Sequence, residues 1–116
     1  MIETDKGYVF GGYLDKGWNS TGNWITSNAA FLFSLKCHAN MPSTKISINN
    51  SNYAAYGTSS YGPTFGGIHI SSNSNANATS YSRIGTGYNM PDGISEPTFL
   101  NGQQHFKVSE IEIFQL

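Results

Sequence analysis

Hydrophobic and polar residues alternate in several short runs along the chain. In "FGGIHI", Ile68 and Ile70 share one phase and His69 lies in the other, and "TKISI" repeats the same pattern. A period of two predicts strands that bury one face and expose the other. The uninterrupted apolar run "AAFLFSLKC" instead predicts a central strand that is buried on both faces.

The C-terminal segment "HFKVSEIEIFQL" carries the most regular alternation in the chain. Phe106 and Val108 share one phase, whereas Ile111 and Ile113 share the other, so the pattern predicts a bulge or kink near Ser109. Near the other end, "GYVFGGYL" predicts a strand whose glycine pair permits a bulge or a close backbone approach.

A helical period of about 3.6 residues is absent almost everywhere, so the chain is expected to be mainly β. The predicted fold is an antiparallel two-sheet β-sandwich with few or no helices, formed by residues 1–116 as a single domain. The core is expected to contain side chains from the apolar run and from the last strand, namely Phe31, Phe33, Leu35, Val108, Ile111 and Ile113.

Charged side chains are scarce: they make up 11% of the residues, and the formal net charge is −1. Such a surface lacks the basic footprint that binds nucleic acid or an anionic membrane. No apolar segment is long enough to span a bilayer, so we expect no nucleic-acid partner and no membrane insertion. The single cysteine, Cys37, excludes an internal disulfide and favours a reducing compartment such as the cytoplasm.

No motif in the sequence indicates a catalytic site. The three histidines lack the spacing of a zinc motif, and the glycine pair of "FGGIHI" lacks a phosphate-loop pattern, so we expect no metal and no cofactor. An enzyme that uses His69, Cys37 or the paired glutamates Glu110 and Glu112 is the alternative. On a regular strand, however, such a glutamate pair is ordinarily a solvated polar face.

Several segments, taken in order, resemble the C-terminal part of the TLDc domain. They are "GYVFGGY", Trp18 and Trp24, "AFLFSL", "SYGPTFGG", "SYSRIGTGY" and "FKVSEIEIF". The resemblance runs over essentially the whole chain and over roughly the last two thirds of the family's domain, which implies that an upstream segment is missing. Many relatives carry a pattern like Phe-Gly-Gly-Gly-His-Asp where this chain has the shorter "FGGIHI".

The resemblance implies a sandwich of two antiparallel sheets with a few flanking helices, and a binding module rather than an enzyme. Members of the family are associated with resistance to oxidative stress, and several bind the vacuolar proton-pumping ATPase. A protein partner is therefore expected, with the vacuolar ATPase as a candidate. Five residues of the family's motifs would fix the corners of the sandwich: Gly11, Gly12, Phe65, Gly66 and Gly67.

We expect contacts with a partner to come from loops and from Trp18, Tyr61, Glu110 and Glu112. Two alternatives remain open. Exposed tryptophan, tyrosine and asparagine side chains also suit a carbohydrate-binding β-sandwich. Alternatively, the chain is a truncated fragment without independent function, and its exposed sheet edge would pair with another chain or with a second copy.

Overall fold

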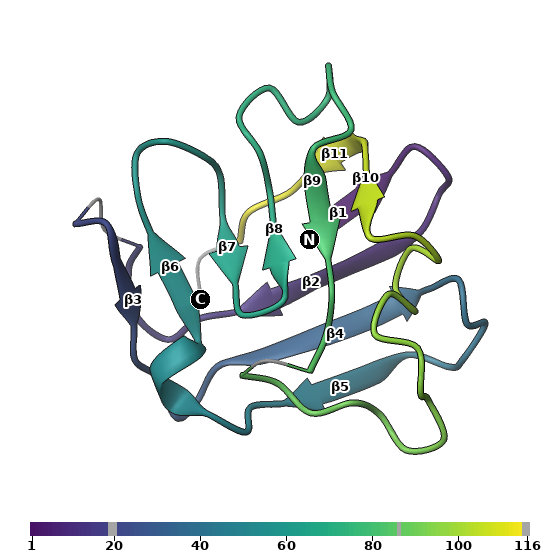
Figure 1. The fold of residues 1–116 in the computed structure, drawn as a ribbon, viewed down its shortest axis with the longest axis horizontal. Helices are drawn as coiled ribbons and strands as arrows, with labels where there is room; N and C mark the ends of the chain where they lie inside the picture. Colours follow the sequence, from purple (N-terminus) through teal and green to yellow (C-terminus); the bar gives the residue numbers. More distant parts are fainter. Residues whose placement is uncertain (19–20, 86, 115–116) are drawn as a thin grey trace.

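Two antiparallel sheets pack face to face in the computed structural model, which describes residues 1–18, 21–85 and 87–114 (Figure 1). The first sheet has five strands in the order β11 (Val108–Ile111), β1 (Ile2–Thr4), β2 (Val9–Tyr13), β4 (Phe31–Lys36) and β5 (Thr44–Ser47). The second sheet has six, in the order β10 (His105–Phe106), β9 (Ser80–Ser82), β8 (Ile68–His69), β7 (Thr64–Phe65), β6 (Ala55–Gly57) and β3 (Asn23–Ile25). Figure 1 shows that the strands of the two sheets cross steeply.

This arrangement confirms the predicted antiparallel sandwich. Within the described ranges, helical structure is limited to one short 3-10 turn, η1 (Ser51–Tyr53), which the side chain of Asn50 caps by accepting from the Asn52 N–H. None of the described residues forms a helix that is long and apolar enough to cross a membrane.

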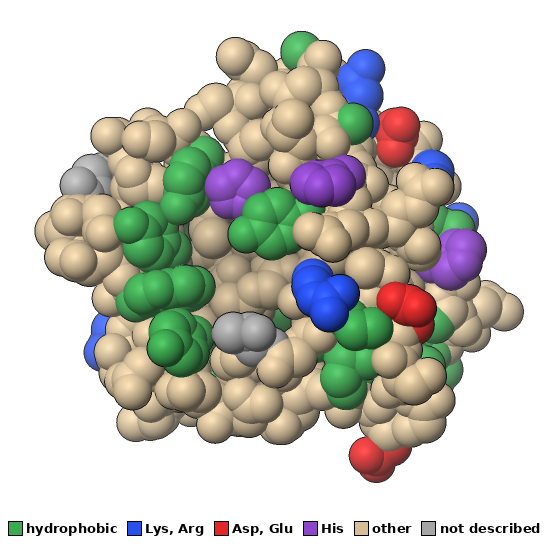
Figure 2. All heavy atoms as spheres, in the orientation of Figure 1, with side chains coloured by type: hydrophobic (Ala, Val, Ile, Leu, Met, Phe, Trp, Pro, Cys, Tyr) green, Lys and Arg blue, Asp and Glu red, His purple; other side chains and the backbone are tan. Residues whose placement is uncertain are grey.

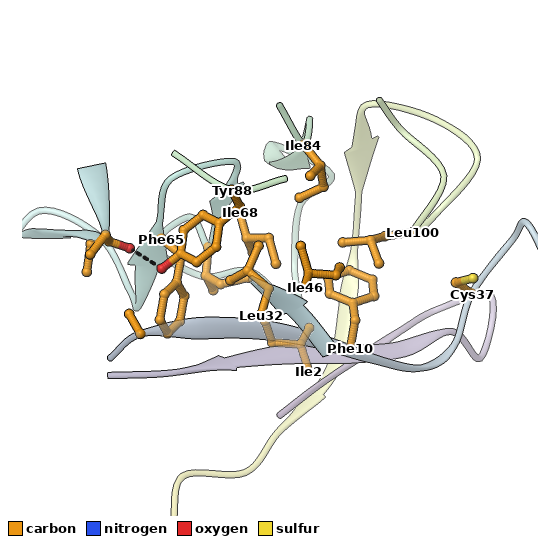
Figure 3. Close-up of a cluster of buried hydrophobic side chains, with 14 of the residues drawn as sticks. Ile2, Phe10, Leu32, Cys37, Ile46, Phe65, Ile68, Ile84, Tyr88 and Leu100 are labelled. Atoms are coloured by element: carbon orange, nitrogen blue, oxygen red, sulfur yellow. Dashed lines mark hydrogen bonds between the residues drawn. The ribbon is translucent and has the colours of Figure 1, made fainter. Parts of the chain in front are cut away.

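The hydrophobic core lies between the sheets and receives one face of each (Figure 3). Phe10, Leu32 and Ile46 project from the first sheet, and Ile68 projects from the second. The ring of Phe10 meets the ring of Phe106 edge to face, with 5.4 Å between their centroids. In the alternating runs, every second side chain is therefore buried, as the sequence predicts.

The prediction that the run "AAFLFSLKC" is buried on both faces is wrong. Leu32 and Ser34 point into the core and are 0% and 1% exposed, whereas Phe31 and Phe33 are half-buried and Leu35 is 49% exposed. The second sheet packs on the inner face of β4 only, so these three apolar side chains occupy the outer face of the first sheet. A continuous apolar run here combines a buried face with a partly exposed apolar face.

Ser109 forms the bulge that the change of phase predicts. Glu110 pairs with Glu3 and Val108 pairs with Thr4, which leaves Ser109 as the extra residue. The hydroxyl of Ser109 donates to the carbonyl oxygens of Glu3 (3.1 Å) and Thr4 (3.2 Å), so the bulge is held by its own side chain.

The two isoleucines beyond this bulge do not belong to the core, contrary to the prediction. Val108, on the near side of the bulge, is buried as expected, but Ile111 is 36% exposed and Ile113 is 79% exposed. Because β11 is the edge strand of the first sheet, a side chain beyond the bulge lies at the rim of the sandwich rather than between the sheets.

Gly66 and Gly67 form the turn between β7 and β8, where Phe65 pairs with Ile68. Gly67 has a φ of +101°, which favours glycine, and a Cβ atom there would lie 2.9 Å from the carbonyl oxygen of Arg83. The pair thus turns the chain between two strands and lets a third segment approach closely.

Candidate functional site

Exposed apolar side chains gather around a groove at one edge of the sandwich, which we call the edge groove. Among the described residues, eight large hydrophobic side chains are exposed, and five of these line the groove: Trp18, Leu35, Ile111, Ile113 and Phe114. The groove has a volume of about 790 Å³. A concentration of exposed apolar groups in one concavity is a common feature of protein- and ligand-binding surfaces.

Two glycines shape the edge groove. A Cβ atom on Gly12 would lie 2.6 Å from the ring of Phe65, and one on Gly11 would lie 2.8 Å from the ring of Phe33. Trp18 and Phe65 pack edge to face, with 5.2 Å between their ring centroids. The absence of side chains at these positions allows the two phenylalanine rings to lie close against β2.

The backbone of β11 forms an open edge of the first sheet, on the side that faces away from β1 and from the groove residues of β1, β2 and β4. Met1 and Glu112 exchange two hydrogen bonds, each 2.8 Å long, between their main-chain nitrogen and carbonyl oxygen atoms. In an antiparallel ladder the neighbouring pair, Ile2 and Ile111, then directs its N–H and C=O groups away from each other. Ile2 pairs with Phe10 on its other side, whereas no described residue pairs with Ile111 on the open side.

Three carboxylates follow the outer face of this edge. Glu110 lies opposite Glu3, and Glu112 follows the end of β11 and bonds through its main chain to Met1, so the three exposed side chains lie on one face. None of them forms an ion pair with a lysine or arginine in the described part of the chain. The ammonium group of Met1 donates to the main-chain oxygen of Glu112, and burial lowers the pKa of that ammonium while the charge of Glu112 raises it.

A second feature lies on the outer face of the six-stranded sheet, and we call it the aromatic row. Seven rings are in unbroken contact across the strands: Tyr53, Trp24, Tyr56, Tyr61, His69, Tyr81 and His105. The centroids of neighbouring rings are 4.3 to 6.1 Å apart. Figure 2 shows histidine side chains next to hydrophobic ones on this face.

The residues expected to contact a partner divide between these two surfaces. Trp18 and Glu112 line the edge groove, and Glu110 lies on the strand beside it. Tyr61 lies in the aromatic row, between Tyr56 and His69. Leu35 and Ile113, which the sequence pattern places in the core, line the edge groove instead, and so does Phe114, which no sequence signal marks as a contact residue.

The side chains that were considered for catalysis lie apart from one another or are buried. Cys37 belongs to the buried core, and His38 contacts the hydroxyl of Tyr8 through Nδ1 at 3.1 Å. His69 lies between Tyr61 and Tyr81 in the aromatic row, where burial lowers its pKa. In the described ranges, no three His, Cys, Asp or Glu side chains are grouped so that they could hold a metal ion.

Comparison with known proteins gives one match. The family model for the TLDc domain matches residues 1–116, which is the whole chain. No curated protein and no solved structure matches. Because the match covers every residue, the chain belongs to the TLDc domain family.

Proposed function

We propose that this chain is a non-enzymatic protein-interaction domain that contributes to resistance against oxidative stress. The observation that carries the proposal is the concentration of five of the eight exposed large hydrophobic side chains in the edge groove. The resemblance to TLDc proteins suggests the vacuolar proton-pumping ATPase as the partner. Exposed aromatic and aliphatic anchors surrounded by polar residues are the usual composition of a protein interface.

Two side chains of the edge groove are suited to anchor a partner. Ile113 and Phe114 are 79% and 69% exposed, so a partner that covers them removes apolar area from water without disturbing the core. The glutamates at the same edge would form part of the polar rim, which influences association rate and specificity more than affinity.

Capture of the purified vacuolar ATPase by the immobilised chain tests this proposal, together with survival of peroxide-treated cells that express it. We expect a variant with Ile113→Ser and Phe114→Ser to lose both capture and protection. Trp24→Ser is the matched control, because Trp24 is 45% exposed but lies in the aromatic row. Unchanged capture and protection in the groove variant would contradict the proposal.

The absence of catalysis is tested separately. Cys37→Ala and His69→Ala variants should keep full protection against peroxide, provided that both variants melt cooperatively. Loss of protection in either folded variant would favour an enzyme that uses the Cys37 thiol or the His69 imidazole.

The aromatic row supports carbohydrate binding as a second candidate function, because ring faces and edges pack against the C–H groups of sugars. Trp24, which lies between Tyr53 and Tyr56 in the row, reports on this surface by its fluorescence. A saturable change in this fluorescence on titration with simple sugars, absent in Tyr81→Ala, would support carbohydrate binding. No change in the fluorescence of the wild-type chain would rule out carbohydrate binding.

A further inference from the structure

We propose that two copies of this chain pair through the outer face of the five-stranded sheet, related by a two-fold axis that runs along β2. The outer face is the one turned away from the second sheet, and β2 is the middle strand of the five. The inference goes beyond the proposed function, because it concerns a second copy of the chain and not a different protein.

A first row of side chains crosses the outer face from negative to positive charge. Glu110 lies opposite Glu3, and Glu3 lies opposite Val9. Val9 in turn lies opposite Lys36. The residues on either side of Glu3 are buried, so this row lies on the face away from the core. The row begins with carboxylates, passes an apolar side chain and ends with an ammonium group.

A second row, one step along the strands, repeats this order of charges. Glu112 and Met1 exchange main-chain hydrogen bonds, and the Cα atom of Met1 would lie 3.1 Å from a Cβ atom on Gly11. Gly11 lies opposite Phe33, and Phe33 lies opposite Lys45. This row therefore also has a carboxylate at one end, apolar groups in the middle and a lysine at the other end.

The middle of the outer face is apolar and open to water. Tyr13 stacks on Phe31 with 5.2 Å between ring centroids, and both are half-buried. Phe33 is also half-buried, and Leu35 is 49% exposed. A second sheet packed on this face would remove their exposed apolar area from water, as in the core of a sandwich.

The charges at the two ends are available to a second molecule. Within the described part of the chain, neither Lys36 nor Lys45 forms an ion pair with a carboxylate, and the ammonium group of Lys45 lies 4.3 Å from the centroid of the Phe31 ring. The ammonium group of Met1 donates to the main-chain oxygen of Glu112 and offsets only one of the three carboxylates at the opposite end. The face is thus acidic at one end and basic at the other.

A two-fold axis along β2 reverses each row between the copies, so the face is complementary to itself. Glu3 of one copy then lies over Lys36 of the other, and Glu112 lies over Lys45. Packed sheets lie about 10 Å apart, a gap that a glutamate and a lysine side chain bridge together. A purely acidic or purely basic partner would match one end of the face, whereas a second copy matches both ends.

Sedimentation equilibrium of the purified 116-residue chain tests the inference. With neighbouring strands about 4.8 Å apart, the sheet is about 19 Å wide, so the interface is small. We therefore expect a reversible dimer with a dissociation constant on the order of ten micromolar. Added salt should weaken the dimer, because it screens the exposed charge pairs.

Two complementary charge variants provide the decisive comparison: Glu3→Lys/Glu112→Lys and Lys36→Glu/Lys45→Glu. All four side chains are exposed, so the melting temperatures should stay near that of the wild type. Each variant alone should dimerise about tenfold more weakly or not at all, because like charges then face each other. An equimolar mixture should dimerise again, since every introduced charge lies over an opposite charge in the mixed dimer. Asp92→Lys/Glu96→Lys is the matched control outside the first sheet and should dimerise like the wild type.

Three results would overturn the inference: a wild-type chain that stays monomeric up to about 0.5 mM, a charge variant that dimerises as tightly as the wild type, or a mixture that does not recover the dimer. Protection of the Ile111 amide from exchange in the dimer would also overturn it, because the copies would then pair through the open edge of β11. Sedimentation uses the purified chain alone, so its failure leaves capture of the vacuolar ATPase unaffected. A chain that dimerises as expected but captures no partner would refute the proposed interaction function only.

Discussion

The hydroxyl of Tyr88 donates a 2.8 Å hydrogen bond to the carbonyl oxygen of Ala54, and both residues are fully buried (Figure 3). Tyr88 also forms an isolated β-bridge with Ile48. Tyr88 thus joins the long segment after β9 to the residue that follows β5 through its backbone, and to the residue that precedes β6 through its side chain.

Replacing Tyr88 by phenylalanine should lower the free energy of unfolding by about 1–3 kcal/mol, because the buried carbonyl of Ala54 loses its donor. Chemical denaturation measures this difference. Tyr53→Phe is the control: Tyr53 is exposed, so the change should stay within about 0.5 kcal/mol of the wild type. Equal stability of Tyr88→Phe and the wild type would mean that Ala54 finds another donor.

Tyr88 also predicts how stability changes at alkaline pH. Burial raises the pKa of Tyr88 above its ordinary value of about 10, so the native state holds the phenolic proton more tightly than the unfolded state does. This stability is fully present below pH about 10 and is lost as the pH rises above it. Melting temperatures between pH about 9 and 11 should fall less steeply for Tyr88→Phe than for the wild type. Parallel profiles would contradict this account.

Gly12→Ala should destabilise the fold by about 1–3 kcal/mol, because the new Cβ atom would overlap the ring of Phe65 at 2.6 Å. Gly17→Ala is a matched control, since a Cβ atom at Gly17 meets nothing within 4 Å. In a double-mutant cycle, Phe65→Leu should reduce the cost of Gly12→Ala. An additive double variant would show that the strain lies elsewhere.

Leu32 and Leu35 give a direct test of the corrected orientation of β4. Leu32→Ala should cost about 2–5 kcal/mol, because Leu32 is fully buried among core side chains. Leu35→Ala should cost less than about 1 kcal/mol, because Leu35 is half exposed at the edge groove. Comparable losses of stability in the two variants would restore the original assignment of both faces to the core.

The fold was predictable where a period of two is unbroken. The phase change between Val108 and Ile111 predicted the bulge at Ser109 because a strand that switches its buried face needs an extra residue. The outer face of β4 was not predictable, since a run such as "FLFSL" is compatible with burial on one side or on both. Which sheet face is covered depends on contacts between segments far apart in the sequence.

The candidate site was predictable only in part, for the same reason. Trp18 was predicted as a contact residue because it is a large aromatic side chain in a polar loop. Glu112 was predicted because it is a charged residue of the expected last strand. Both line the edge groove. Ile113 was assigned to the core because hydrophobicity predicts burial. Only the strand order, which makes β11 an edge strand, reveals that Ile113 lies at the rim.

His69 predicts an acid-dependent loss of stability in the aromatic row. Burial between Tyr61 and Tyr81 lowers the pKa of His69 below its ordinary value of about 6.5, so the unfolded state takes up a proton first as the pH falls. The contribution is fully present above pH about 6.5 and is lost below it, until the native-state histidine is protonated too. Melting temperatures at pH about 5 and 8 should therefore differ less for His69→Gln than for the wild type. His105→Gln, at the exposed end of the row, serves as the control, and an equal effect of both substitutions would show that the burial of His69 is not the cause.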